Sequence, residues 1–468
     1  MDGRYKVGGN LFAVCLAAMG LFGVQAANGA GNAAQLGKEL TALGAQVEGN
    51  KEGTIPKHEG KDMPLPGWSW GKNRIDYWKY KNEKPIAVID ASNVDKYADK
   101  LTAGQIQQFK QIKDYKMPIY QTHRTCTVPE WVAENTKKNV DIAKLAANGY
   151  DLADAVLPGT PFPFPKNGAE AIWNSKLRYG GVGILGNGHL TLLAPRKGST
   201  EWLKISQDFI VYFPWGEKGS KRLAELPPYD MMMYYKYDEP PPLAGQATII
   251  NSTFNQPGEA YYYFPGQRRV RRMPTYAYDA ELIGMENEYP VDTLLGYSGR
   301  IDRYDWKLVG KKEVYVPYNA FRQYDLTQDW HKIYFPDHVS ETTRRYELHR
   351  VWVVEATVKA GTRHSAARRT FYLDEDTWAM LILDSYDAQG KLWKTAEDLM
   401  IPAWENNSAC VYSGVFYYNL VSRRLEIDQF SINGTHGGDF KFLPDTVGHP
   451  EFSTNFYTPE NLRAISER

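Results

Sequence analysis

The chain is organised around one stretch that runs from Leu243 to Met273, LAGQATIINSTFNQPGEAYYYFPGQRRVRRM. It predicts a strand, a loop and a tight hairpin. The aromatic run Ala260–Phe264 stops at Pro265-Gly266, a dipeptide whose fixed and permissive φ values suit a turn. The chain then returns on a strand that is predicted to cover Arg268–Met273. Two strands joined by so short a turn must be antiparallel, because a parallel neighbour needs a crossover of a dozen or more residues.

The returning strand is unusually basic, with four arginines close together at Arg268, Arg269, Arg271 and Arg272. Since alternate side chains of a strand face opposite ways, Arg268 and Arg272 share one face and Arg269 and Arg271 the other. In one interpretation this is a solvated outer strand whose long side chains lie over aromatic neighbours. In the other, the arginines are planar hydrogen-bond donors that hold carboxylate or phosphate oxygens at the rim of an apolar pocket. Under the second interpretation the four arginines and Tyr262 are candidate ligand-binding residues.

Strand patterns dominate the chain after Trp173. Short segments alternate with turn residues, as in the meander whose turns are Asp374-Glu375-Asp376-Thr377 and Asp387-Ala388-Gln389-Gly390. The acidic residues of the first turn are expected to form a solvated hairpin tip, where carboxylates make local hydrogen bonds. The predicted strands are Gly188–Leu193, Trp202–Val211, Ala247–Phe254, Ala260–Phe264, Arg268–Met273, Arg345–Lys359, Arg368–Leu373, Trp378–Tyr386 and Leu392–Leu399, with a hairpin-like piece at Gly414–Asp428.

Helical patterns lie earlier, at Ala33–Leu43, Leu101–Tyr115 and Val128–Ala147, the last predicted to stop at Asn148-Gly149. Helices early and strands late indicate an α+β fold. We expect a large curved antiparallel β-sheet, a half-barrel, wrapped around helices from the N-terminal part.

Two segments rich in proline connect these elements. Residues Gly53–Pro85 are expected to form an extended arm that lies on other parts of the chain. Residues Gly159–Gly168 alternate proline with phenylalanine and can form neither a helix nor a central strand. Phe162 and Phe164 either line a cavity or pack across the end of the sheet.

The first 26 residues resemble a signal peptide. A positive start, an apolar run and the small-residue site Val24-Gln25-Ala26 predict export to the periplasm and cleavage near Ala26. The residues before Cys15 do not suit a lipidation site, so we expect no lipid anchor and a soluble mature protein. Residues 27–170 are expected to form an N-terminal helical and extended arm region and residues 171–468 the curved sheet region, with 27–468 making one continuous domain.

Net charge and cysteine content narrow the possible partners and bear on the compartment of the protein. The 55 basic and 55 acidic residues give a formal net charge of zero, which argues against nucleic acid as a partner. After cleavage two cysteines remain, Cys126 and Cys410. An oxidising compartment permits a disulfide between them, and two free buried thiols are the alternative.

The sequence contains no recognisable set of catalytic residues. The sequence contains no phosphate-binding glycine loop, no G-x-S-x-G and no H-E-x-x-H motif. His331, His338 and His349 lack ligand spacing on one predicted element, so no metal site is expected. His123 and Arg124 with Asp90 could be polar groups of a site, but the sequence does not bring them together. We therefore expect a protein without catalytic residues, cofactor or metal.

Several segments in order resemble the exported bacterial family called domain of unknown function 1329, over essentially the whole mature chain. They are YYYFPGQRRVRRMP, GTPFPFPKNG at Gly159–Gly168, MPIYQTHRT at Met117–Thr125, TALGAQVEGNKEGTIP at Thr41–Pro56 and GVFYYNLVSRRLEID at Gly414–Asp428. That family resembles the Lol-type outer-membrane lipoprotein carriers and sorting proteins in fold. The resemblance implies an apolar cavity, together with inner-membrane permeases of the resistance-nodulation-division type and an outer-membrane β-barrel protein as partners.

The same function follows from the sheet itself. A large sheet curved around too few helices would leave an apolar cavity, which suits a lipid or another hydrophobic molecule. The first hypothesis is therefore a periplasmic carrier or chaperone for such a molecule. A non-enzymatic structural adaptor of an envelope transport complex is the second, and a hydrolase of an envelope polymer is a third.

Overall fold

A computed structural model describes residues 31–274, 276–430 and 440–467. The predicted signal peptide and Cys15 lie outside these residues. No helix within the described ranges is both long and apolar enough to cross a membrane. The α-helices are α1 (Ala103–Gln111), α2 (Glu130–Ile142), α3 (Gly168–Lys176), α4 (Trp330–Ile333) and α5 (Pro459–Ser466).

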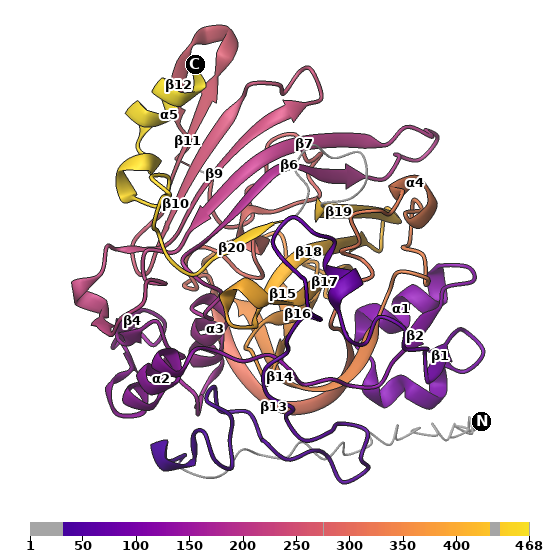
Figure 1. Cartoon of the computed structure of the whole chain (residues 1–468). Coiled ribbons are helices and arrows are strands. Elements are labelled where there is room, and N and C mark those ends of the chain that lie inside the picture. Colours follow the sequence, from indigo (N-terminus) through magenta and orange to yellow (C-terminus); the bar gives the residue numbers. More distant parts are fainter. Residues whose placement is uncertain (1–30, 275, 431–439, 468) are drawn as a thin grey trace, which may run out of the picture.

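One sheet of 16 strands dominates the molecule (Figure 1). Its path is β1-β2-β14-β15-β16-β17-β18-β19-β6-β7-β9-β10-β11-β12, with β13 paired to β14 and β20 to β6. All its pairings are antiparallel except the contact of β2 with β14. The strands are β1 (Ala87–Ile89), β2 (Met117–Ile119), β6 (Gly183–Leu193), β7 (Leu203–Tyr212), β9 (Tyr229–Glu239), β10 (Ala247–Thr253), β11 (Glu259–Phe264), β12 (Arg269–Arg272), β13 (Tyr304–Pro317), β14 (Tyr346–Val358), β15 (Arg368–Asp374), β16 (Met380–Tyr386), β17 (Leu392–Ala403), β18 (Ala409–Asn419), β19 (Arg424–Phe430) and β20 (Lys441–Leu443).

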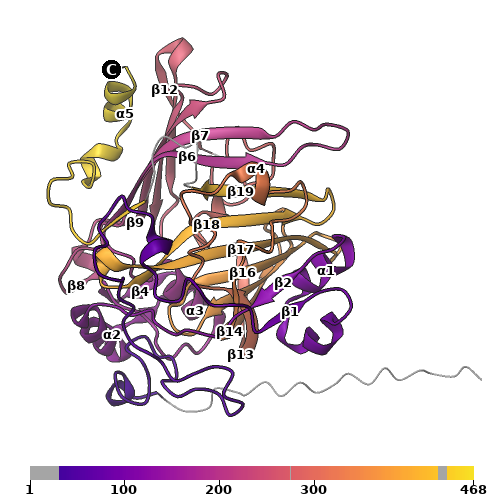
Figure 2. The ribbon, with the colours of Figure 1, turned by 45° about the vertical axis from the view of Figure 1, so that its right-hand side comes forward.

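Two short strand pairs lie outside this sheet, β3 (Lys144–Leu145) with β4 (Leu152–Asp154) and β5 (Val156–Leu157) with β8 (Lys221–Arg222). The predicted α+β class with a large curved antiparallel sheet is confirmed (Figures 1 and 2).

The hairpin of the opening stretch forms where it was predicted. Tyr262 pairs with Arg271 and Tyr263 with Val270, so β11 and β12 are antiparallel. The turn is one residue longer than predicted, because Arg268 adopts the left-handed conformation with φ of 47° and closes the turn. Arg268 is therefore a turn residue, and only the other three arginines lie on the strand.

The helices are shorter than predicted. Ala33–Leu43 holds only a single turn of 3-10 helix, Ala33–Gln35, and α2 ends at Ile142. Asn148-Gly149 therefore does not stop a helix but turns the chain between β3 and β4. Helix α3 was not predicted. It begins where the Asn167 side chain accepts a hydrogen bond from the Glu170 amide, which is an N-cap that follows the proline-rich connection.

The largest core cluster contains the apolar side chains of one face of the sheet, which we call the inner face. This face carries Met233 and Tyr235 of β9, Val354 of β14, Phe371 of β15 and Tyr417 of β18. The connection between β12 and β13 and helix α3 supply the other side of this core. The opposite face is covered in part by α5, which lies beside β10 to β12 in Figure 2 and packs Leu462 with residues such as Tyr263.

Candidate functional site

Residues 276–303, which we call the inner segment, connect β12 to β13 across the inner face of the sheet. A connection of this length with almost no regular structure is uncommon in a compact domain and is usually functional. Its one regular element is a short 3-10 turn, Val291–Thr293. The inner segment contributes to the main core through the buried side chains of Tyr276, Leu282, Met285, Tyr289, Val291, Leu294, Tyr297 and Ile301.

Polar side chains of the sheet hold the backbone of the inner segment. Tyr237 donates a hydrogen bond of 2.7 Å to the Ile283 carbonyl, and Tyr417 one of 3.1 Å to the Thr293 carbonyl. The Lys394 ammonium donates to the Glu288 carbonyl at 2.8 Å. Water or a ligand head group can replace such hydrogen bonds one by one. A segment held only by buried apolar contacts has no bonds that can be exchanged in this way.

One buried ion pair anchors the middle of the inner segment. Asp292 accepts hydrogen bonds from both terminal nitrogens of Arg369 on β15, at 2.7 and 3.0 Å, and His364 Nε2 lies 2.9 Å from the same carboxylate. Burial alone would raise the pKa of Asp292, but Arg369 and His364 outweigh it and hold that pKa below its usual value. Asp292 is therefore ionised and paired within the core.

The space beside the inner segment is filled with side chains. A cavity of about 50 Å³ is bounded by Leu294, Tyr297 and Ser298 together with Lys176 and Tyr412. Further cavities of about 20 Å³ adjoin the same segment. A water molecule needs roughly 10–15 Å³ and a ligand pocket roughly 300–1,000 Å³. The open apolar cavity expected from the sequence is thus occupied in this structure, because the inner segment fills it.

The proline-rich connection packs against α3, and ligand binding by Phe162 and Phe164 stays a prediction. Phe162 is buried in the main core, and its backbone is fixed to α3 by two hydrogen bonds with the Asn174 side chain. Phe164 is half-buried. Neither residue borders the cavities beside Leu294 or Met285.

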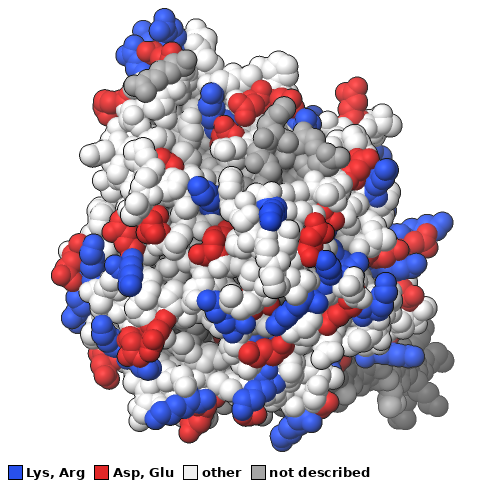
Figure 3. Space-filling model, in the orientation of Figure 1, with Lys and Arg blue, Asp and Glu red and all other residues white. Residues whose placement is uncertain are grey.

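Arg268 in the turn and the three arginines of β12 lie at the free edge of the sheet, and their exposed side chains belong to the basic cluster at the top of Figure 3. Arg271 and Arg269 share the face of Ala260 and Tyr262, so they belong to the inner side of the sheet. Arg272 faces the other way and pairs with Glu259 at 2.8 Å, while Arg268 approaches Glu467 at 3.7 Å. Binding of a ligand by the arginines and by buried Tyr262 stays a prediction.

The acidic turn between β15 and β16 is buried, and its assignment as a solvated hairpin tip was wrong. Asp374, Glu375 and Asp376 are each less than 5 % exposed. Arg124 donates two hydrogen bonds to Asp376, at 2.9 and 2.7 Å, so the structure brings Arg124 to a polar cluster. His123 lies between Glu59 and Glu83, whereas Asp90 is at the end of β1 and forms local hydrogen bonds with Ser92, Asn93 and Val94.

Cys126 and Cys410 form a disulfide whose Cα atoms are 5.4 Å apart. Of the two alternatives for these cysteines, the structure thus has the bonded one. The bridge joins the segment after β2 to β18, across 284 residues of sequence.

Glu281 is a carboxyl group of the inner segment whose pKa is raised. Burial raises the pKa of Glu281 to about 7. The charge of Lys394 opposes this shift, and the neighbouring carboxylates of Glu288 and Asp292 add to it. A carboxyl group whose pKa is raised by packing stabilises the packed state fully below its ordinary value of 4.5, and this stabilisation is lost as pH rises through about 7. We therefore expect the inner segment to open more readily at about pH 8 than at about pH 6.

Hydrogen–deuterium exchange of residues 276–303, corrected for intrinsic rates, measures this opening. The increase from about pH 6 to about pH 8 should be smaller in Glu281→Gln than in the native protein, because the neutral amide does not titrate. Glu341→Gln, at an exposed position, is the control and should behave as the native protein. An identical pH response in all three proteins would show that Glu281 does not control the segment.

The chain was compared with known proteins. The family model described as "Protein of unknown function (DUF1329)" matches residues 88–463. A relative from Pseudomonas aeruginosa, "Uncharacterized protein PA3922", is 40 % identical over 380 residues, which span 80 % of this chain and 82 % of that protein.

Solved structures give more distant likenesses. A putative outer membrane lipoprotein-sorting protein domain from Vibrio parahaemolyticus is 14 % identical with a TM-score of 0.40, covering 63 % of this chain and 97 % of its own. A DUF1329 family protein from Desulfovibrio piger is 15 % identical with a TM-score of 0.38, over 59 % and 92 % of the two chains. A LolA superfamily protein from Nitrosomonas europaea is 9 % identical with a TM-score of 0.35, over 62 % and 100 %.

Proposed function

The chain belongs to the family described as "Protein of unknown function (DUF1329)", and from this premise we propose that it is a non-enzymatic carrier or chaperone in the periplasm that binds a lipid or another hydrophobic molecule. The ligand lies on the inner face of the sheet. The inner segment occupies that space when no ligand is bound, and the ligand displaces it.

The observation that carries this proposal is the way in which the inner face is filled. Besides α3, its partner is an irregular connection of 28 residues, 276–303, held by hydrogen bonds to its carbonyl groups. Displacing this connection would uncover Met233, Tyr235, Phe371 and Tyr417. An apolar surface of this kind on a rigid sheet suits a hydrophobic ligand.

The disulfide supports the proposed location, since disulfides persist in oxidising compartments such as the periplasm. Export through the first 26 residues belongs to the same proposal. So do an inner-membrane permease of the resistance-nodulation-division type and an outer-membrane β-barrel protein as the partners between which the ligand passes.

The filled interior also favours a second function, a structural adaptor that docks envelope partners and binds no ligand. One experiment separates the two. Protein purified from its native periplasm without detergent is extracted with organic solvent, and the extract is analysed by mass spectrometry against an extract of another periplasmic protein prepared in parallel. A carrier yields about one hydrophobic molecule per chain, whereas an adaptor yields none above the control.

The arginine hairpin provides a prediction within this proposal. If Arg269 or Arg271 holds an anionic head group at the rim of the inner face, its replacement by glutamine should weaken binding by about 1.5–3 kcal/mol, the range for a hydrogen bond to a charged group. Arg272→Gln is the matched control, because Arg272 is on the same strand but faces the other way and pairs with Glu259.

Displacement of a fluorescent fatty acid measures the affinity, with the melting temperature recorded for each variant. Equal affinities for all variants at unchanged stability would show that the four arginines do not bind the ligand and are only solvated side chains of an outer strand. Exposed positions of that kind change stability by less than about 0.5 kcal/mol.

A further inference from the structure

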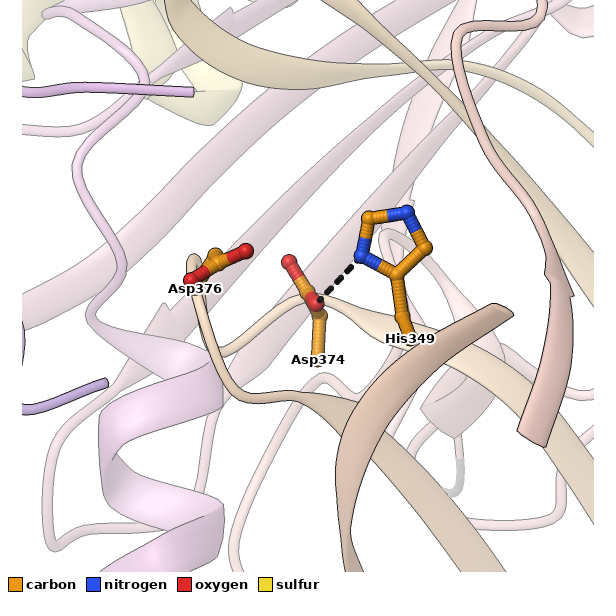
Figure 4. A group of neighbouring side chains, drawn as sticks. All are labelled: His349, Asp374 and Asp376. Carbon is orange, nitrogen blue, oxygen red and sulfur yellow. Dashed lines mark ion pairs between the residues drawn. The ribbon is translucent and has the colours of Figure 1, made fainter. Parts of the chain in front are cut away.

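A second site lies apart from the inner segment, where β14 meets the turn after β15. Figure 4 shows His349 of β14, Asp374 at the end of β15 and Asp376 of the turn pointing toward one another. One ligand atom from each lies within 4.8 Å of the other two. Asp374 is 0 % exposed, and His349 and Asp376 are also buried.

Glu347 and Tyr318 fix the orientation of the His349 ring. Its Nε2 lies 3.3 Å from a carboxylate oxygen of Glu347, and its ring stacks on Tyr318 at 3.7 Å between centroids. A carboxylate at Nε2 favours the tautomer that carries its proton there, which leaves the Nδ1 lone pair free to bind a cation. This Nδ1 faces Asp374 Oδ1 at 3.9 Å.

Asp374 stands out among the neighbouring carboxylates because no cation of its own neutralises it. Asp376 pairs with Arg124, Glu347 with Arg345, and Glu375 with both Lys311 and Arg350. Among the ion pairs of the described residues, Asp374 has only the one with His349.

The two oxygens of Asp374 also differ. Oδ2 accepts hydrogen bonds from Tyr318 at 3.1 Å and from Thr377 at 2.7 Å, whereas buried Oδ1 has no hydrogen-bond partner in this part of the structure. An uncompensated buried carboxylate oxygen is costly. The site thus lacks one positive charge at a defined point, between Oδ1 and His349 Nδ1.

From this geometry we infer that His349, Asp374 and Asp376 bind one divalent transition-metal ion of the zinc class. His349 Nδ1, Asp374 Oδ1 and a carboxylate oxygen of Asp376 are the protein ligands, while Glu347, Tyr318 and Arg124 hold them in place. A nitrogen ligand with only two carboxylates suits Zn²⁺ better than Ca²⁺, which takes six to eight oxygens.

The distance between His349 Nδ1 and Asp374 Oδ1 fits such an ion after a small adjustment. Ligands about 2.0–2.2 Å from zinc lie roughly 3.3 Å from one another in a tetrahedron, against 3.9 Å between Nδ1 and Oδ1 here. The site is closed to solvent, so the ion would have a structural role and would tie β14 to the turn. This inference is independent of the proposed carrier function.

The test uses untagged protein purified from native periplasm without chelators or metal-affinity resin, with metal content measured by inductively coupled plasma mass spectrometry. We expect about one zinc-class ion per chain in the native protein and less than a tenth of an ion in Asp374→Asn. His338→Gln is the matched control, because His338 and Asp337 form a histidine–aspartate pair at 2.8 Å elsewhere in the protein. It should keep the ion.

A second measurement remains decisive if Asp374→Asn fails to fold. Prolonged treatment of the native protein with a strong chelator should lower its melting temperature by several degrees, and added Zn²⁺ should restore it. A native protein with less than a tenth of an ion per chain, and no response of its melting temperature to Zn²⁺, overturns the inference and leaves a proton shared by Asp374 and His349. An ion retained in Asp374→Asn overturns it too, by placing the metal elsewhere.

Discussion

Replacing Arg369 by methionine is expected to lower the free energy of unfolding by about 3–5 kcal/mol, the usual cost of removing one partner from a buried ion pair. Arg369 and Asp292 are both almost completely buried, and the guanidinium makes two hydrogen bonds to the carboxylate. Without Arg369, the Asp292 charge would remain in the core with only His364 beside it. The effect should be concentrated in the inner segment, because Asp292 is its anchor.

Chemical denaturation gives the global effect, and hydrogen–deuterium exchange shows whether residues 276–303 open first. Arg368→Met is the matched control: Arg368 is the neighbouring residue on β15, but it lies over the Tyr386 ring as a half-buried cation worth about 0.5–1 kcal/mol. The double variant Asp292→Asn with Arg369→Met should recover much of the loss, since no uncompensated charge remains. Equal losses for Arg368→Met and Arg369→Met would contradict the anchor role.

Removing the disulfide by Cys126→Ala with Cys410→Ala is expected to cost about 2–5 kcal/mol. The bridge connects residues 284 apart in sequence, so its absence frees a long loop in the unfolded chain. Unfolding in guanidinium chloride measures the difference. A reductant should destabilise the native protein by a similar amount and leave the double-alanine variant unchanged.

The alkylation pattern checks the same bond independently. Denatured but unreduced protein should incorporate no label at Cys126 or Cys410. Labelling of both thiols, together with stability that is indifferent to reductant, would contradict the disulfide.

Local pattern predicted much of the sheet, because strands with one buried face alternate. It missed the short strands β1, β2 and β20 and, for identifiable reasons, the long strands β9 and β13. In β9, Met231, Met233 and Tyr235 face the main core while Met232 and Tyr234 are covered by α5 and its neighbours, so no alternation is visible.

In β13, a bulge at Gly310 shifts the register against β14. Trp306 before it belongs to the main core, whereas Val314 and Val316 after it belong to another cluster. The strand changes faces part of the way along, and a pattern of fixed period does not describe it.

The candidate sites depend on partners that are far apart in sequence. The sequence of the acidic turn is typical of an exposed hairpin tip, yet Arg124 reaches Asp376, the Gln46 amide donates to Glu375, and Trp378 donates to the Leu43 carbonyl. Residues Leu43, Gln46 and Arg124 of the N-terminal region therefore cover the turn, which the sequence could not indicate. The inner segment gave only a weak signal, apolar residues such as Leu282, Met285 and Leu294 without helical or strand spacing.

Hydrogen–deuterium exchange with and without a bound hydrophobic ligand tests the central claim most directly. Native protein is saturated with a fluorescent fatty acid, and the exchange of residues 276–303 is compared with that of β14 to β18. The account predicts that the ligand accelerates exchange in the inner segment and leaves the strands unchanged or slower. The account would be contradicted if the protein were saturated with ligand and residues 276–303 exchanged at an unchanged rate. It would also be contradicted if the protein bound no fatty acid at concentrations that saturate a known periplasmic lipid carrier.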